Sequence, residues 1–306
     1  MYDCKSYAGL LLDRERIEIF TKAIETLTGK GDTVAELGSG LGTYAMAAAR
    51  AGARKVFAVE KGRIFPLLER IIQRNRFHDI VIPVRESIEK WTPPEKIDLV
   101  IFEDFPKGGI CSDTLNIIKT SKEAFPDARF LPKAISFKAA PVRLLADSGT
   151  EKKLRTSYLI ANFDFTLLAD YLTDSIYSVD LTPASLLGDP QEMWTLNFDL
   201  PLPSFSSEMS WQMEAGEKCD GIAFWFELDL GNGIVLSNSP GTHITVWGQT
   251  LCPFSSCCSA SDVFELTAEL SFQQNGDIWN WSASWMNNKE KHSTAFSVPL
   301  DKNNFF

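Results

Sequence analysis

The sequence predicts an α/β fold, in which a doubly wound parallel sheet is followed by an antiparallel β-barrel or β-sandwich domain. A buried strand at residues 33–37, an alanine-rich helix at 44–50 and a second buried strand at 55–59 form a strand–helix–strand unit. Residues 183–306 instead show short apolar runs separated by Gly, Asn, Ser and Pro, a pattern typical of antiparallel strands. Together, the two patterns indicate two domains.

An amphipathic stretch opens the chain. Its leucine and isoleucine spacing predicts a helix over residues 7–20, followed by further helix to residue 27. Within it, Arg16 is a candidate ligand for a carboxylate, because a guanidinium can donate two parallel hydrogen bonds to one carboxylate. The alternative is a surface arginine that pairs with Glu15 or Glu18.

Three glycines at alternate positions, Gly38, Gly40 and Gly42, follow the first strand. A turn without side chains lets a ligand approach the backbone closely. Glu60 stands at the tip of the second strand, where a carboxylate can accept hydrogen bonds from both hydroxyls of a ribose. The spacing differs from the G-x-G-x-x-G pattern of dinucleotide sites, so a nucleotide other than NAD or FAD is favoured.

The next turn is a candidate adenine site. A helix over residues 64–74 precedes a third strand over 80–84, and ligands of doubly wound sheets lie across the carboxyl ends of the strands. A carboxylate in the following turn could accept a hydrogen bond from the adenine amino group, and a solvated acidic turn is an equal alternative. The candidates are Ser87, Ile88 and Glu89, with Glu86 as the rival acid.

A fourth strand over residues 98–102 is followed by two acids, Glu103 and Asp104. Because successive side chains of a strand point to opposite faces, we expect Glu103 to face the ligand and Asp104 to point away. A loop with one proline and two glycines follows, and Asp113 closes it before a helix over 114–125. Glu103 and Asp113 are therefore the candidate catalytic carboxylates.

The change from alternating helices and strands to other patterns falls near Pro141. We therefore expect one domain over residues 1–140 and a second over 141–306. A strand, turn and strand over 128–138 lead toward this border. Beyond the border, residues 151–177 are predicted to be helical and are rich in Leu, Tyr and Phe, which is typical of a contact surface. Packing of these residues on their own domain is an equal alternative.

Composition argues against several classes of protein. The 306 residues carry a net charge of −10, which does not suggest a nucleic-acid partner. No apolar run approaches the roughly 20 residues of a membrane span, and the early charges argue against a signal peptide. The six cysteines show neither C-x-x-C nor zinc spacing, so we expect no metal site and free thiols in a reducing cytoplasm.

The order of these parts resembles the protein arginine methyltransferases, which use S-adenosyl-L-methionine (SAM). The similar segments are SYAGLLLDRER, VAELGSGLG, VFAVE, KIDLVIFED, ARFLPKAISFKAAPV and SNSPGTHITVWGQT. The resemblance implies that Arg16 grips the SAM carboxylate and that Glu60 binds the ribose. The expected cofactor-binding residues are Arg16, Glu36, Gly38, Gly40, Gly42, Glu60, Ser87, Ile88 and Glu89.

The resemblance also implies a clamp of two carboxylates that holds an acceptor guanidinium. Glu103 matches the first glutamate of the family, but Ser112 occupies the second position and Asp113 comes one residue later. Two carboxylates can orient the guanidinium and localise its charge on one nitrogen, which leaves another nitrogen free to attack the methyl group. The N-terminal motif is closest to the type that makes monomethylarginine alone.

A second departure concerns the Thr-His-Trp loop of the family. Trp247 is present, but Val246 occupies the histidine position; nearby His243 could substitute if the loop were remodelled, or could be an ordinary exposed histidine. The expected partners are a protein or small-molecule methyl acceptor and, through residues 151–177, a second copy of the chain in a homodimer. A methyltransferase for another acceptor and a catalytically silent SAM-binding regulator are the alternative functions.

Overall fold

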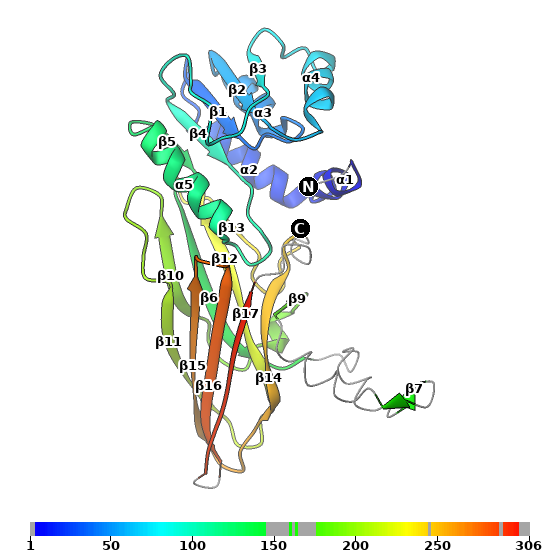
Figure 1. The fold of residues 1–306 in the computed structure, drawn as a ribbon, viewed down its shortest axis with the longest axis vertical. Helices are drawn as coiled ribbons and strands as arrows, with labels where there is room; N and C mark the ends of the chain where they lie inside the picture. The colour runs from blue at the N-terminus through cyan, green and yellow to red at the C-terminus, as the bar shows by residue number, and fades with distance from the viewer. Residues whose placement is uncertain are drawn as a thin grey trace.

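The protein, seen as a computed structural model, is described at residues 4–144, 159–160, 163–164, 176–243, 246–287 and 290–299. These residues form an α/β domain, uppermost in Figure 1, and an elongated β domain below it. Among these residues, no helix is long and apolar enough to cross a membrane.

The α/β domain is built on a five-stranded parallel sheet in the order β3-β2-β1-β4-β5. Its central strands are apolar and buried, as parallel strands covered by helices on both faces must be. The strand order reverses between β1 and β4, and this is where a doubly wound sheet opens a crevice for a ligand. The strands are β1 (Thr33–Leu37), β2 (Lys55–Val59), β3 (Val81–Val84), β4 (Leu99–Phe102) and β5 (Arg129–Leu131).

The helices of this domain differ from expectation in two places. The helix expected over residues 7–20 is interrupted at Asp13, whose Oδ1 accepts a hydrogen bond from the Arg16 backbone N–H at 3.4 Å and so caps the next helix. The helix expected over residues 114–125 begins earlier, at Ser112. The helices are α1 (Cys4–Leu12), α2 (Arg14–Leu27), α3 (Thr43–Ala51), α4 (Phe65–Arg74) and α5 (Ser112–Ala124).

The β domain contains two antiparallel sheets, which confirms the predicted class. One has the order β10-β6-β12-β14-β9, with β13 paired to β12, and the other has the order β11-β15-β16-β17. The strands are β6 (Ala134–Val142), β9 (Tyr177–Val179), β10 (Gln191–Asn197), β11 (Ser206–Met213), β12 (Cys219–Asp229), β13 (Val235–Ser237), β14 (Gln249–Cys258), β15 (Phe264–Gln273), β16 (Ile278–Asn287) and β17 (Glu290–Pro299).

A stack of aromatic rings joins the two sheets. Trp279 on β16 is fully buried and lies 5.9 Å from Trp194 on β10 and 4.5 Å from Phe224 on β12, measured between ring centroids. Along β15, buried positions alternate with more exposed ones. Each sheet therefore turns one face to a shared core, as in packed antiparallel sheets.

The change of sheet comes earlier than the expected border at residue 140. β5 pairs with β4 in the parallel sheet, whereas β6 begins at Ala134 and pairs with β12 in the β domain. The described pieces of the segment 151–177 include the short antiparallel strands β7 (Leu159–Ile160) and β8 (Phe163–Asp164), so a helix is not found there. The remainder of the expected helix, 151–158, 161–162 and 165–175, lies outside the described residues.

Candidate active site

A cavity of about 630 Å³ opens at the carboxyl ends of β1, β2 and β4. It is bordered by α1 and α2, and the β domain contributes part of its wall. The predicted site residues that line it are Arg16, Glu36, Gly38, Glu60, Ile88, Glu103, Asp113 and Trp247. The predicted site residues outside its described lining are Gly40, Gly42, Ser87, Glu89 and His243.

The three glycines of the glycine-rich turn have different surroundings and therefore different roles. Gly38, Gly40 and Gly42 have positive φ angles of 74°, 53° and 76°, which favour glycine. A Cβ on Gly40 would lie 2.8 Å from Tyr7 Cε1 of α1. A Cβ on Gly42 would lie 2.6 Å from Leu68 Cδ1 of α4. These two glycines therefore allow close packing, whereas Gly38 has space around it and lines the cavity.

Glu60 follows β2 and is fixed by backbone donors. Its Oε2 accepts a hydrogen bond from the Gly40 N–H at 2.9 Å, and its Oε1 accepts one from the Gly62 N–H at 2.5 Å. A carboxylate oxygen has more than one acceptor site, so both oxygens can accept a further hydrogen bond. The result is a pre-positioned pair of acceptors at the cavity, suited to two neighbouring hydroxyls.

Glu36 lies on β1 beside the start of α3. Its Oε2 accepts a hydrogen bond from the Ala45 N–H at 2.7 Å. Burial raises the pKa of Glu36 to about 8, and repulsion from Glu103 and Glu60 adds to the rise, whereas the backbone donors oppose it. A neutral carboxyl at this position limits the negative charge at the base of the cavity.

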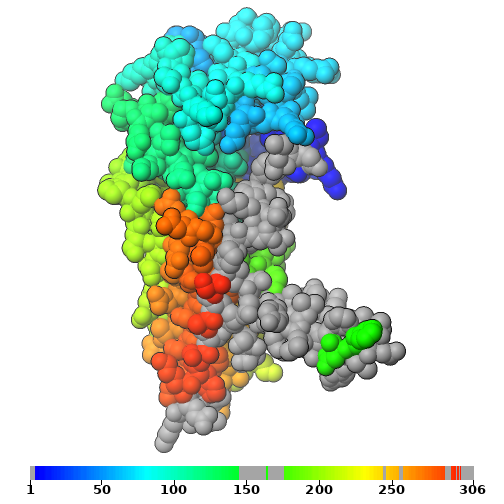
Figure 2. Space-filling view, in the orientation of Figure 1, coloured from blue at the N-terminus to red at the C-terminus, as the bar shows by residue number. Residues whose placement is uncertain are grey.

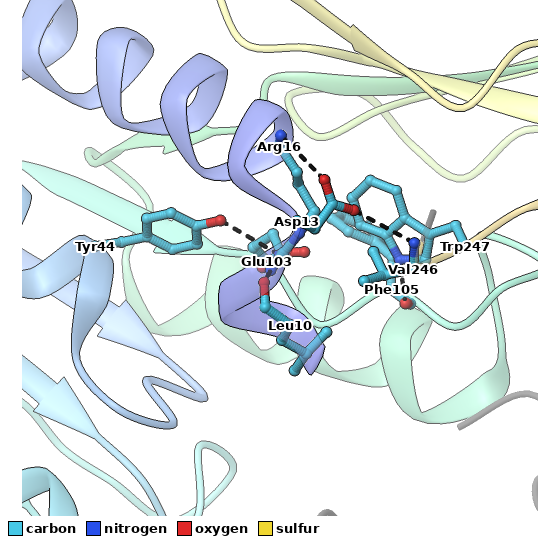
Figure 3. Close-up of polar contacts among 8 residues, drawn as sticks. All are labelled: Leu10, Asp13, Arg16, Tyr44, Glu103, Phe105, Val246 and Trp247. Carbon is cyan, nitrogen blue, oxygen red and sulfur yellow. Dashed lines mark hydrogen bonds and ion pairs between the residues drawn. The ribbon is translucent and has the colours of Figure 1, made fainter. Parts of the chain in front are cut away.

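Arg16, the candidate ligand of the cofactor carboxylate, contacts Glu103, the candidate ligand of the acceptor (Figure 3). Arg16 Nη1 lies 2.5 Å from Glu103 Oε2 and 3.3 Å from the Tyr44 hydroxyl, and Arg16 Nη2 donates to the Leu10 carbonyl at 2.8 Å. Burial raises the pKa of Glu103, although the charge of Arg16 opposes that rise. Among the described residues, Arg16 Nε has no hydrogen-bond partner. The guanidinium therefore keeps one N–H group without an acceptor among the described residues.

The loop that carries Trp247 is tied to both sides of the cavity (Figure 3). Trp247 Nε1 donates to the Phe105 carbonyl at 3.0 Å, and the Arg16 guanidinium lies 5.7 Å from the centre of the Trp247 ring. The Val246 N–H donates to Asp13 Oδ2 at 3.3 Å. Our sequence reasoning missed Asp13, although an aspartate before a helical stretch is a capping signal. His243 is exposed and stands outside the described lining.

Asp104 corrects one expectation. It lines the same cavity as Glu103 rather than pointing away, because β4 ends at Phe102 and the alternation of a strand no longer applies beyond it. Asp104 is exposed at the open cavity, yet desolvation by the surrounding cavity wall raises the pKa of its carboxyl, and Glu60 and Asp113 raise it further, whereas Lys61 opposes them. The cavity therefore holds an additional carboxylate between the glycine-rich turn and α5.

Ser112, at the second glutamate position of the resemblance, is directed to the β domain. Its N–H donates to Asp277 Oδ1 at 2.5 Å, and its hydroxyl donates to the Gln274 carbonyl. Asp113, the next residue, belongs to the first turn of α5 and lines the cavity. The second candidate carboxylate is therefore carried by the helix and not by the preceding loop.

In the turn expected to border the adenine, the cavity is lined by Glu86, which the sequence offered as the rival acid, and by Ile88. Ser87 and Glu89 stand outside the described lining, and Glu86 and Glu89 are both exposed. The Glu86 carboxylate accepts a hydrogen bond from the Ser87 N–H at 2.9 Å, which turns it back toward its own loop.

Comparison with known proteins finds arginine methyltransferases among the proteins similar to this chain. Residues 142–282 match the model of the arginine methyltransferase oligomerization subdomain. The chain is 28% identical over 257 residues to an arginine N(omega)-methyltransferase of Streptomyces achromogenes subsp. streptozoticus, an alignment that covers 80% of this chain and 70% of the relative. It is 23% identical over 304 residues to protein arginine N-methyltransferase 6 of Danio rerio, covering 93% and 86%. Over most of its length, the chain is therefore similar to protein arginine methyltransferases.

Solved structures of arginine methyltransferases share the fold. The Trypanosoma brucei PRMT1 enzyme–prozyme complex with AdoHcy gives a TM-score of 0.84 at 17% identity, over 95% of this chain and 97% of that one. Arabidopsis thaliana protein arginine methyltransferase 10 gives 0.80 at 19% identity, over 97% and 100%. Both the parallel sheet and the β domain of this chain are included in these alignments.

Proposed function

We propose that this protein is a SAM-dependent N-methyltransferase that transfers a methyl group to an arginine guanidinium of a protein. One observation carries the proposal: Glu103 already holds a guanidinium, that of Arg16, at 2.5 Å beside the glycine-rich turn. A carboxylate that binds one guanidinium has the charge and geometry to orient another. The names of the relatives, which are arginine methyltransferases, support the same acceptor.

The residues of the cavity fit SAM. Glu60 offers two fixed acceptor oxygens for ribose hydroxyls, and Gly38 leaves room for close approach of a ligand. Arg16 is buried and has an Nε that lacks a hydrogen-bond partner among the described residues, so it can accommodate a carboxylate. Bound SAM would supply an electrophilic methyl group on its sulfonium. We assign Glu86 rather than Glu89 to the adenine side, because Glu86 lines the cavity.

The chain's own residues would act mainly by position and charge. Glu103 would hold the acceptor guanidinium from one side, and Asp113 on α5 would hold it from the other. Their negative charges would concentrate the positive charge of the acceptor on the bound nitrogens and leave the remaining nitrogen able to attack. Trp247, tied to the Phe105 carbonyl, would form a wall that limits water near the reacting atoms.

The decisive experiment is transfer of label. The protein is incubated with methyl-labelled SAM and a cell extract, the proteins are hydrolysed, and the labelled amino acid is identified. We expect label on arginine, and far less of it when Glu103→Gln replaces the wild type. Label on another residue or on a small molecule would favour a different acceptor. SAM binding without transfer would favour a regulatory protein.

A second function is supported by the altered clamp. Ser112 is bonded to Asp277, and Val246 has no imidazole to offer at the family's histidine position. A small-molecule acceptor, or a side chain other than arginine, would depend less on a glutamate at the Ser112 position and on a histidine at the Val246 position. The same extract experiment distinguishes this second function from arginine methylation.

We further propose that the protein acts as a homodimer in the cytoplasm. The matched family model is that of an oligomerization subdomain, and Phe163 on β8 is 67% exposed, so this aromatic ring is not packed on its own domain. Figure 2 shows β7 and β8 clear of the α/β and β domains. Cys4, Cys111 and Cys252 are free thiols, in agreement with a reducing compartment. Sedimentation at micromolar concentration tests the dimer, and a monomer would contradict it.

A further inference from the structure

The turn between β15 and β16 reaches the start of α5. In Figure 1 the upper end of this hairpin lies just below α5, and three hydrogen bonds join the two. Asp277 Oδ1 accepts from the Ser112 N–H at 2.5 Å, and the Gln274 carbonyl accepts from the Ser112 hydroxyl. One helical turn later, Gln274 Nε2 donates to Asn116 Oδ1 at 3.3 Å. The hairpin therefore holds the first turn of the helix.

Asp277, a residue of the β domain, caps the N-terminus of α5. The first backbone N–H groups of a helix have no acceptor within the helix, and here the N-cap residue Cys111 makes no side-chain capping bond. Asp277 is 6% exposed, lies 165 residues away along the chain, and offers a negative charge where the helix dipole favours one. Its φ angle of 52° lies in the left-handed region, within the short turn between β15 and β16.

Fixing the start of α5 affects the two candidate clamp carboxylates, Glu103 and Asp113. Asp113 directly follows Ser112 in the first turn of α5, and it lines the cavity together with Glu103. A shift or fraying of this turn would move Asp113 relative to Glu103. We infer that Asp277 is a positioning residue of the acceptor site, which acts by fixing the start of α5 and, through it, Asp113. This role rests on the proposed function.

The test removes the cap without straining the backbone. Asp277→Gly keeps the positive φ angle and deletes the carboxylate, whereas Asp277→Asn keeps an acceptor oxygen and tolerates the same φ. Asn232→Gly is the matched control, because Asn232 is an exposed turn residue with a φ angle of 54° outside the described cavity lining. Loss of a capping bond should lower kcat/KM for the acceptor by about fivefold to tenfold in Asp277→Gly. SAM affinity should stay unchanged, Asp277→Asn should keep most of the activity, and Asn232→Gly should keep all of it.

Two further measurements separate positioning from general stability. In a protein that already carries Asp113→Asn, Asp277→Gly should cause no further loss of kcat/KM, because both changes act on one carboxylate. Hydrogen exchange of the Ser112 amide should accelerate in Asp277→Gly, and this readout needs no acceptor. Equal losses in both backgrounds, or an unchanged Ser112 amide, would overturn the role. Failure of the wild type to label arginine would remove the proposed function and this role with it, whatever the exchange result says about the cap.

Discussion

Arg16 Nη1 lies 2.5 Å from Glu103 Oε2, and the two side chains are 4% and 12% exposed. This buried ion pair joins the residue expected to bind the cofactor carboxylate to the residue expected to bind the acceptor. Glu103 directly follows β4, one of the two strands between which the strand order reverses. The two binding events are therefore expected to influence each other through one guanidinium.

Glu103→Gln should abolish most transfer while SAM binding persists. The substitution keeps the shape of the side chain but removes the charge that orients the acceptor, and losses of about 100-fold or more in kcat are typical of such groups. Single-turnover assays and calorimetry with SAM check the two parts. Asp262→Asn, at an exposed turn, is the control. Retained activity in Glu103→Gln would show that another carboxylate holds the acceptor.

Glu60→Ala should weaken SAM binding strongly. It removes the acceptors of the Gly40 and Gly62 N–H groups and of the proposed ribose hydroxyls. At about 1.5–3 kcal/mol for each charge-assisted bond, the affinity should fall by roughly 10-fold to 150-fold for each ribose hydroxyl bond that is lost. Calorimetry measures this directly, with Glu89→Ala as a control because Glu89 is exposed and outside the described lining. An unchanged affinity would remove Glu60 from the ribose site.

Glu36 should make stability depend on pH. Its pKa is about 8 in the folded protein against an ordinary value of 4.5, so between these values the folded state holds a proton that the unfolded state has released. The free energy of unfolding should therefore fall as pH rises from about 4.5 to about 8, by on the order of a few kcal/mol. Glu36→Gln should flatten this dependence, and urea unfolding across that range measures it. An unchanged slope would mean that Glu36 is ionised in the folded state.

The Val246 N–H should matter more than the Val246 side chain. Val246→Pro removes the donor to Asp13 Oδ2, whereas Val246→Ala keeps it. Since a hydrogen bond contributes about 0.5–1.5 kcal/mol, the acceptor KM should rise roughly threefold to tenfold in Val246→Pro and hardly change in Val246→Ala. Steady-state kinetics with saturating SAM provide the measurement. Equal effects of the two substitutions would show that the side chain, not the backbone bond, positions Trp247.

Local signals predicted the parts of the site that depend on short stretches of chain. The bounds of β1 and β2 follow from buried apolar runs, and the glycine turn between β1 and α3 has the positive φ angles that its residues suggest. Asp104 could not be placed, because its direction is decided after β4 has ended. The direction of Ser112 depends on Asp277, which lies 165 residues later and carries no local mark of that contact.

The junction between the two sheets bears on whether the two domains could be expressed separately. Pro132 and Lys133 lie between β5 and β6, and the Lys133 N–H is bonded to the Asp229 carbonyl at 2.8 Å, so the connection offers no slack for a hinge. Glu103 precedes this point and Trp247 follows it, yet both line one cavity. Expressing the two halves as separate modules would thus cut the cavity itself, and each fragment would carry an incomplete wall of it.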